Sequence, residues 1–218
     1  MEDILTEVIM LNTIGIDRLY YFAPIKNLSN ILNYGILSKN EINNRRIPYD
    51  SFANEEVQNK RHSRYFFLSN NVISSGHDCV PLYMRPLSPT QYACKEKELD
   101  FIFFVFDSSI VNNSAYAFSD GNIACKDTRI FNSRNDLGKI PVKAIGERYW
   151  TQSIDGKRKA SSEVLIHKRV SVEEAKFIVV SSNRVKKIVE EQLSKKKISI
   201  EIKINENYYF TRNSLILH

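Results

Sequence analysis

An α+β fold is predicted for this chain, because many short strand-like segments accompany only two clearly amphipathic helices. The strand-like segments are apolar runs at residues 19–22, 80–84, 101–106, 163–167 and 175–180. With 218 residues, 43% of them hydrophobic and 11% aromatic, the chain can bury one substantial core. We therefore expect a single domain over residues 1–218, built as a mixed β-sandwich with flanking helices and a core at about residues 19–205.

The first half of the chain combines one strand and one helix with a long polar region. Residues 4–9 form a short amphipathic stretch, and residues 19–22 are strand-like. A helix is expected over residues 27–34, where apolar side chains recur at helical spacing and Gly35 follows as a left-handed C-cap. Residues 39–75 are polar and charged, which predicts an irregular functional loop region.

The second half is richer in strands. Residues 80–84 and 101–106 are expected to be buried strands, although Pro81, Pro86 and Pro89 should prevent the following segment from pairing as a central strand. Residues 108–150 are mixed, with a loop at 119–122. Strands at 163–167 and 175–180 flank a capping-box turn at 171–174. A helix at 182–195 and a half-solvated strand at 198–204 complete the chain.

The formal net charge of +6 suits a polyanionic partner. Five cations, Arg45, Arg46, Lys60, Arg61 and Arg64, gather in the polar region. The nearby aromatic residues Tyr49, Phe52, Tyr65, Phe66 and Phe67 offer surfaces on which bases can stack. The alternative is a loop that packs on the core through these aromatic residues and leaves its charges solvated.

Cysteine usage and hydropathy indicate the compartment. The three cysteines, Cys79, Cys94 and Cys125, show no metal-ligand spacing, which favours a reducing cytoplasm. No signal peptide opens the sequence, and the longest apolar run is too short to span a bilayer. We expect a cytoplasmic protein with no membrane partner and no metal site.

Glu163 is the first candidate for chemistry. A cationic run at residues 157–159 leads through small residues to this carboxylate, which opens an apolar strand. Burying a carboxylate at that position costs free energy unless the group is paired or takes part in chemistry. The alternative is an ordinary glutamate at the edge of a strand, facing water.

Six motifs occur in an order that is typical of one family. They are LYYFAPIKNL at 19–28, GILS at 35–38, VQNKR at 57–61, HDCVPLYMRPLSPTQY at 77–92, SDG at 119–121 and RKASSEVLI at 158–166. Together they resemble the DarT family of nucleic-acid ADP-ribosyltransferase toxins. The resemblance implies the ADP-ribosyltransferase fold, NAD as co-substrate, single-stranded nucleic acid as partner (DNA favoured, RNA possible) and a macrodomain-type antitoxin.

The reaction explains why a carboxylate is needed. Positive charge builds on the ribose of NAD as nicotinamide leaves, and a nearby carboxylate stabilises it, as in glycoside hydrolysis. The resemblance implies that Glu163 is catalytic and that Arg61 positions NAD or the acceptor. Lys60 replaces the first arginine of the family's pair and cannot make the same planar contact. Tyr21 replaces a histidine that contacts NAD, and Ala23 and Pro24 replace the rest of that motif.

The resemblance also implies the binding residues. Those expected to bind NAD are Tyr20, Tyr21, Phe22, Asn27, Leu28, Gly35, Leu37 and Arg61. Those expected to bind nucleic acid are Arg45, Arg46, Tyr49, Lys60, Arg64, His77, Tyr83, Arg85, Tyr92 and Arg158. His77 has a structural alternative, and Asp120 and Asn122 either contact ribose or form a plain turn.

The predicted function is a toxin that transfers one ADP-ribose from NAD to a base in single-stranded DNA, with thymine favoured and guanine as the second choice. The alternatives are the same reaction on RNA or protein, and a catalytically inactive relative that binds nucleic acid.

Overall fold

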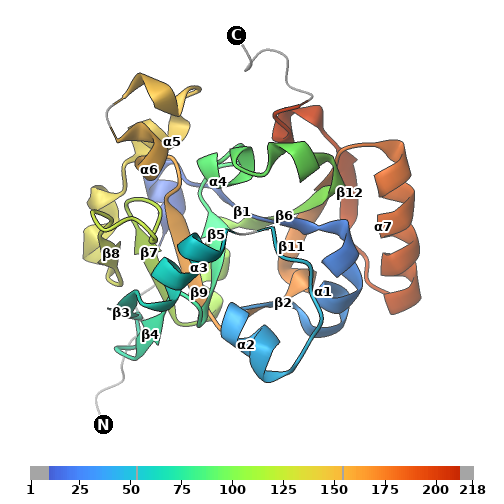
Figure 1. The fold of residues 1–218 in the computed structure, drawn as a ribbon, viewed down its shortest axis with the longest axis horizontal. Helices are drawn as coiled ribbons and strands as arrows, with labels where there is room; N and C mark the ends of the chain where they lie inside the picture. Colours follow the sequence, from blue (N-terminus) through green and yellow to red (C-terminus); the bar gives the residue numbers. More distant parts are fainter. Residues whose placement is uncertain (1–9, 53, 154, 212–218) are drawn as a thin grey trace.

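A mixed eight-stranded sheet forms the centre of the computed structural model, which describes residues 10–52, 54–153 and 155–211 (Figure 1). Neighbouring strands follow the order β12 (Glu201–Ile204), β11 (Ala175–Val180), β6 (Phe101–Asp107), β1 (Arg18–Pro24), β5 (Cys79–Tyr83), β9 (Glu163–His167), β7 (Tyr116–Ser119) and β8 (Ile130–Phe131). The pair β11–β12 is parallel, and the pairs joining the other neighbours are antiparallel. The α+β class predicted from the sequence is confirmed.

The sheet consists of two halves that meet at a narrow junction. β1 pairs with β6 along its whole length, from Arg18 to Pro24. Within the described chain, β1 and β5 pair at a single position, Tyr20 with Tyr83. Beyond this point the halves diverge, and β5, β9 and β7 run at a steep angle to β1 and β6 (Figure 1). The junction brings residues from both halves close together.

Pro81 lies within the central strand β5, which ends at Tyr83, so the prediction that the proline-containing segment would not continue as a central strand is confirmed. The backbone N–H of Met84 and the carbonyl of Asp78 both hydrogen-bond toward the β9 side, to Ser162 and Lys168. Because backbone groups alternate in direction along a strand, the nitrogen of Pro81 faces the opposite side. That side faces the junction, where the ladder to β1 is not continued and a missing N–H breaks no bond.

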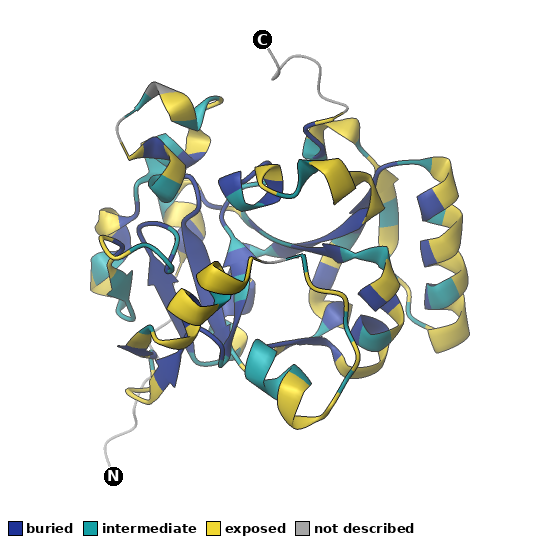
Figure 2. Ribbon diagram, viewed as in Figure 1, coloured by how far each residue is buried: buried dark blue, intermediate teal, exposed yellow. Residues whose placement is uncertain are grey.

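Helices α1 (Leu28–Tyr34) and α7 (Asn183–Lys196) pack against one face of the sheet, as the apolar periodicity predicted. Figure 2 shows α7 buried on its inner side and exposed on its outer side. The Ser182 hydroxyl caps α7 by accepting from the Val185 N–H at 3.4 Å. Gly35 ends α1 with φ +83° and ψ 179°, a positive-φ conformation that is essentially restricted to glycine but differs from the predicted left-handed helical cap.

The prediction of an irregular loop over residues 39–75 was wrong in part. This region holds α2 (Lys39–Asn44), α3 (Glu55–His62) and the hairpin strands β3 (Tyr65–Phe67) and β4 (Ile73–Ser75). Side-chain caps start both helices: Ser38 accepts from the Glu41 N–H, and Asn54 accepts from two N–H groups. Because their exposed faces are polar, these helices show no apolar periodicity in the sequence.

Several shorter elements complete the fold. They are α4 (Pro89–Tyr92), α5 (Val142–Gly146), α6 (Gly156–Lys159) and the paired strands β2 (Ile36–Leu37) and β10 (Arg169–Val170). The turn predicted at 171–174 is a 3₁₀ turn in which the Ser171 side chain makes no cap. The strand predicted at 198–204 is shorter, and residues 4–9 lie outside the described chain.

The described residues contain no helix with the length and apolar character needed to cross a membrane.

The core fills both faces of the sheet. One large cluster, which includes Leu19, Phe104 and Val164, packs under α1 and α7. The opposite face carries two smaller clusters, one around Phe22 and Phe103 and the other around Phe66 and Leu165. The junction between the two halves lies between these smaller clusters, where a polar side chain can be buried without displacing apolar packing.

Candidate active site

Glu163 is the first residue of β9 and lies at the junction. The sheet register places it beside Tyr83, which in turn lies beside Tyr20. Residues paired in this way share a face of the sheet. Leu165, two residues further on, is on the same face and belongs to one of the two smaller clusters. Glu163 is 1% exposed, so the alternative of a glutamate facing water does not hold.

Arg61 approaches Glu163 from α3. Its Nη1 donates to Glu163 Oε1 at 2.8 Å, and its own exposure is 7%. The backbone N–H of Ile123 donates to the same oxygen at 3.1 Å. Burial disfavours the charged guanidinium, but the charge and hydrogen bond of Glu163 outweigh it and hold the pKa of Arg61 above its usual value. The pair is therefore a buried ion pair.

One atom of each partner is left over. Within the described chain, Glu163 Oε2 and Arg61 Nη2 are buried and have no hydrogen-bond partner. Buried polar groups are almost always paired, and an unpaired one is costly. The pair thus keeps one acceptor oxygen and one donor nitrogen free, which suits a ligand that carries a hydroxyl and an anionic or carbonyl oxygen.

The position of α3 is fixed by the loop that precedes β5. His77 is buried, and its Nε2 lies 3.1 Å from Gln58 Oε1. Its ring also lies against that of His62, with the ring centres 5.1 Å apart. Burial, followed by the neighbouring His62 and Arg61, lowers the pKa of His77. The structure places His77 as a support for α3 rather than on the surface.

Gly76 allows this loop to approach Arg61 closely. A Cβ atom at Gly76 would lie 2.6 Å from the Arg61 carbonyl oxygen and 2.8 Å from Ile123 Cδ1. Both contacts are shorter than van der Waals distance. A side chain at this position would therefore displace the residue that contacts Glu163 and the residue whose N–H orients it.

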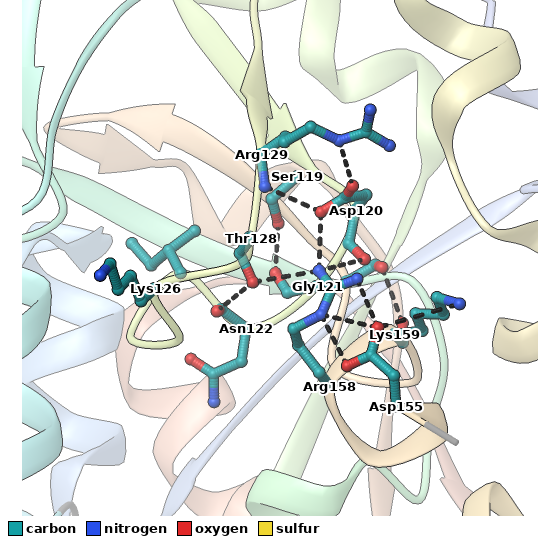
Figure 3. A network of polar contacts seen from close by, with 12 residues as sticks. Ser119, Asp120, Gly121, Asn122, Lys126, Thr128, Arg129, Asp155, Arg158 and Lys159 are labelled. Carbon is teal, nitrogen blue, oxygen red and sulfur yellow. Dashed lines mark hydrogen bonds and ion pairs between the residues drawn. The ribbon is translucent and has the colours of Figure 1, made fainter. Parts of the chain in front are cut away.

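The loop after β7 is held by a polar network (Figure 3). The Asp120 carboxylate accepts from Arg158 Nη1 at 2.8 Å and from Arg129 Nε at 2.9 Å. Arg158 also binds Asp155, with Nε 2.8 Å from Oδ1. Burial opposes the charge on Asp120, but the bonds from Arg129 and Arg158 outweigh it and hold the pKa of Asp120 below its usual value. The network fixes the loop that presents the Ile123 N–H.

Aromatic rings form a wall beside Glu163. The ring of Tyr83 stacks on Phe22 with centres 5.4 Å apart, and Phe52 stacks on Phe22 at 5.2 Å. Burial and then the Glu163 charge raise the pKa of Tyr83 to about 12, so its hydroxyl stays protonated at neutral pH. A buried carboxylate next to aromatic rings provides the environment that the predicted chemistry requires.

Comparison with known proteins decides the family. A family model described as "ssDNA thymidine ADP-ribosyltransferase, DarT" matches residues 20–210. The chain belongs to the DarT family. This confirms the family, the fold class and the enzyme class, ADP-ribosyltransferase, that the sequence motifs predicted.

Two curated relatives are similar in sequence. A DNA ADP-ribosyl transferase–DNA ADP-ribosyl glycohydrolase fusion protein of Thermosipho africanus is 28% identical over 191 residues, which cover 84% of this chain and 47% of the relative. A DNA ADP-ribosyl transferase of Thermus sp. is 25% identical over 177 residues, which cover 77% of this chain and 82% of the relative. The chain therefore spans about half the length of the fusion protein and most of the Thermus protein.

Solved structures share the DarT fold. Thermus sp. 2.9 DarT in complex with ADP-ribosylated ssDNA superposes with a TM-score of 0.81 at 22% identity, covering 89% of this chain and 97% of that one. The same protein in complex with NAD+ gives a TM-score of 0.76 at 21% identity, covering 90% and 98%.

Four residues expected to bind NAD in this DarT-family chain gather around one small cavity. Tyr21, Asn27, Gly35 and Leu37 line it together with Tyr49, which was expected to bind nucleic acid. Burial raises the pKa of Tyr21, and the neighbouring Tyr83 and Tyr49 contribute. The cavity lies beside β1, the strand that carries Tyr21.

Asn27 holds the loop that covers this cavity. Its Nδ2 donates to the Asp50 carbonyl at 2.9 Å, and its Oδ1 accepts from the Asp50 N–H at 2.8 Å. Phe52 continues this loop onto the aromatic wall. A short run of backbone therefore links the cavity to the rings beside Glu163.

The remaining residues expected to bind NAD lie elsewhere. Leu28 is fully buried in the core under α1, and Phe22 is buried among aromatic rings. Tyr20 packs edge-on against Tyr208, with ring centres 6.0 Å apart. Tyr20 and Phe22 lie on the face of the sheet that carries the junction, Leu28 lies in the core on the other face, and none of the three lines the small cavity.

The residues expected to bind nucleic acid do not form one patch. Arg45 pairs with Glu41 at 2.6 Å and Lys60 pairs with Glu56 at 2.7 Å, whereas Arg46 is exposed. Three others are tied to the protein itself: Arg64 to the Thr128 carbonyl, Arg85 to the Glu147 carbonyl and Arg158 to Asp120. Tyr92 packs against Trp150 and Phe210.

Sequence reasoning missed two contributors to the site, the Ile123 N–H and the close approach at Gly76, which both act through the backbone. Phe52 was predicted as a base-stacking surface, and its ring packs on Phe22. The SDG motif at residues 119–121 was the one available signal for the loop that carries Ile123.

Proposed function

We propose that this chain transfers ADP-ribose from NAD to a thymine base of single-stranded DNA and releases nicotinamide. The observation that carries the proposal is the buried Arg61–Glu163 pair, which leaves one acceptor oxygen and one donor nitrogen free. The family description, ssDNA thymidine ADP-ribosyltransferase, supports the choice of acceptor.

The side chains present fit NAD. The free Oε2 of Glu163 is placed to accept from a ribose hydroxyl, and the free Nη2 of Arg61 is placed to donate to an oxygen of the substrate. The partly buried rings of Tyr83 and Phe52, which both stack on the buried Phe22, offer a surface for a flat heterocycle. The structures of Thermus DarT with NAD+ and carba-NAD+ support this assignment.

Glu163 has two chemical tasks in this proposal. NAD supplies a ribose carbon that becomes positively charged as nicotinamide departs. The fixed negative charge of Glu163 stabilises that charge, and its oxygen then takes the proton that the acceptor nitrogen loses. Arg61 pairs with the carboxylate and, together with the Ile123 N–H, fixes its orientation.

The acceptor has to be unstacked before it can enter such a junction. A base within a duplex would have to be flipped out, whereas a base in a single strand is already accessible. The structure of Thermus DarT in complex with ADP-ribosylated ssDNA supports a single-stranded acceptor. Guanine, RNA and protein are the competing acceptors, and the experiment below distinguishes them.

We also propose a partner that removes the modification. The Thermosipho relative is a fusion with a DNA ADP-ribosyl glycohydrolase, and a DarTG protein from that organism is solved in complex with ADP-ribose. A macrodomain-type glycohydrolase that acts as antitoxin is the partner this suggests. Both proteins would work in the cytoplasm, where NAD and DNA are available.

Mass spectrometry of modified oligonucleotides tests the proposed function. The wild-type protein is incubated with NAD and four single strands: DNA with one thymine, the same DNA with cytosine in its place, the same DNA with guanine in its place, and RNA of matching sequence. We expect one ADP-ribose on the thymine strand alone. Modification of the guanine strand, of RNA or of the enzyme itself would contradict the thymine assignment. If no NAD is consumed, the protein is a catalytically inactive relative that binds nucleic acid.

A further inference from the structure

The hairpin formed by β3 and β4 presents aromatic side chains to solvent. Tyr65 is 66% exposed and Phe67 is 55% exposed, whereas Phe66 between them is buried. Phe67 pairs across the hairpin with Ile73, which is 63% exposed, so both lie on the outer face. Large aromatic residues grouped on one exposed face are unusual in a soluble domain and indicate a binding surface.

The hairpin is anchored firmly. The ring of Phe66 belongs to the buried cluster of Ile123 and Leu165. The Ser69 N–H donates to the Tyr116 carbonyl at 2.7 Å, which ties the hairpin turn to β7. The Gly76 N–H donates to the Arg64 carbonyl at 3.1 Å. The backbone that carries the outward rings of Tyr65 and Phe67 is therefore held in place, so little backbone entropy is lost when a ligand stacks on them.

The outer face lies close to the candidate active site. Phe66, on the inner side of the hairpin, packs in the same cluster as Ile123, and the Ile123 N–H donates to Glu163. Arg64, at the base of the hairpin, follows α3, which carries Arg61. One layer of side chains separates the exposed rings from the residues that orient the catalytic carboxylate.

A groove runs along this face, and its chemistry is mixed. It has a volume of about 870 Å³ and is lined by Arg64, Tyr65, Phe67, Asn71, Ile130 and Asn132. It therefore contains aromatic faces, amide groups and a guanidinium. Bases stack on aromatic rings, and amides and guanidinium groups hydrogen-bond to bases and phosphates.

The surrounding charge favours an anionic strand. Arg64 Nη2 donates to the Thr128 carbonyl, so its positive charge lies against the loop after β7. Lys126 and Arg129 are exposed on that loop, and Asp127 is the acidic residue between them. Cations exceed acids at this rim, which suits a phosphate backbone.

We infer that the outer face of the β3–β4 hairpin is a stacking platform for nucleotides of single-stranded DNA that flank the modified base. This inference rests on the proposed function and adds a second contact region to it. The strand would extend from the junction past the loop after β7 onto Tyr65 and Phe67. The affinity for single-stranded DNA should therefore increase with the length of the strand, and this can be measured.

The test compares oligonucleotide binding by the full chain without NAD. Fluorescence anisotropy is measured for single-stranded DNA of 4 and 16 nucleotides, with wild type and with Tyr65→Ala/Phe67→Ala. We expect the Kd for the longer strand to rise at least about 10-fold in the variant, because each stacked base contributes appreciably. The Kd for the shorter strand should rise much less. Equal Kd values for wild type and variant on the long strand would overturn the inference.

Control variants separate stacking from general apolar contact. Tyr65→Trp/Phe67→Trp keeps the ring faces and should keep tight binding. Ile188→Ala removes an exposed apolar side chain on α7, at the opposite edge of the molecule, and should change nothing (Figure 1). An Ile73→Ala variant as weak as the double alanine variant would indicate a general apolar docking face and contradict stacking.

The two proposals fail in different ways. If wild type binds the long strand through Tyr65 and Phe67 but modifies none of the four test strands, the proposed function fails and the platform stands. If wild type modifies the thymine strand while the anisotropy is unaffected by Tyr65→Ala/Phe67→Ala, the platform fails and the proposed function stands.

Discussion

Arg61 Nη1 donates to Glu163 Oε1 at 2.8 Å, a contact between residues 102 positions apart in the sequence. It joins α3 to the first residue of β9 at the junction of the two halves of the sheet. Both side chains are buried, yet each has one atom without a partner in the described chain. Such an arrangement stabilises the fold less than a fully bonded pair would. It leaves one carboxylate oxygen and one guanidinium nitrogen available to bind a ligand.

The first prediction concerns the stability of this pair. Arg61→Met should lower the free energy of unfolding by about 3–5 kcal/mol, because it leaves the Glu163 charge buried without a counter-charge. The double variant Arg61→Met/Glu163→Met should recover most of that loss, because it removes both charges. Urea unfolding at pH 7 measures both. Additive losses in the double variant would mean that the two side chains are not coupled.

The second prediction concerns Arg158 as a positioning residue. Arg158→Gln should reduce kcat about 10- to 100-fold, because the loss of a charged hydrogen bond worth about 1.5–3 kcal/mol loosens the loop that presents the Ile123 N–H. The KM for NAD should change little, and Arg158→Lys should restore part of kcat. Arg184→Gln, on the exposed side of α7, is the matched control. A raised KM with unchanged kcat would indicate direct substrate contact instead.

The third prediction follows from the pKa of Asp120, which lies below its usual 3.8 in the folded protein. Because the folded state binds the proton less readily than the unfolded state, Asp120 contributes stability above pH 3.8, and this is lost as the pH falls through the folded pKa. Asp120→Asn should therefore lower Tm clearly at pH 7 and progressively less below pH 4. Thermal unfolding of both proteins from pH 3 to 7 tests this, and a constant Tm difference would exclude it.

The fourth prediction concerns Gly76. Gly76→Ala should lower both Tm and activity, because its Cβ would lie 2.6 Å from the Arg61 carbonyl oxygen and force α3 or the loop to shift. Gly138→Ala is the control, because its Cβ would meet nothing within 4 Å. We expect the control to stay within about 0.5 kcal/mol of wild type. Equal Tm values and equal activities of the two variants would show that α3 tolerates the shift.

Apolar patterning predicted β1, β5, β6, β9, β11 and β12 and the two amphipathic helices, because each buries an apolar face. It did not predict β7 and β8 within residues 108–150, or the short strands β2, β3, β4 and β10. It did not predict α2 and α3, whose turns begin at the caps Ser38 and Asn54 and whose surfaces are polar. Pairing between β5 and β1 at one position is a property of the whole sheet, so the tolerance for Pro81 could not be read from local sequence.

The residues of the candidate site could likewise be predicted from the sequence only in part. Glu163 and Arg61 were predicted from motif resemblance, and the structure brings them into contact. The role of Ile123 was not predictable, because a backbone N–H leaves no side-chain signature. Arg158 was predicted to contact nucleic acid, but its charge is used within the protein because Asp120 and Asp155 flank it. A cationic run in a sequence does not distinguish these two uses.

The most direct test of the central claim is the single-turnover rate of ADP-ribose transfer to a thymine-containing strand, measured for wild type, Glu163→Gln and Glu98→Gln. Glu98 is a fully buried glutamate whose carboxylate accepts from Gln91 Nε2 at 3.0 Å, so it controls for the loss of a buried carboxylate. We expect Glu163→Gln to lose at least about 100-fold in rate while it remains folded by circular dichroism, and Glu98→Gln to keep the wild-type rate. Transfer by Glu163→Gln at the wild-type rate would contradict the assignment of Glu163 as the catalytic carboxylate.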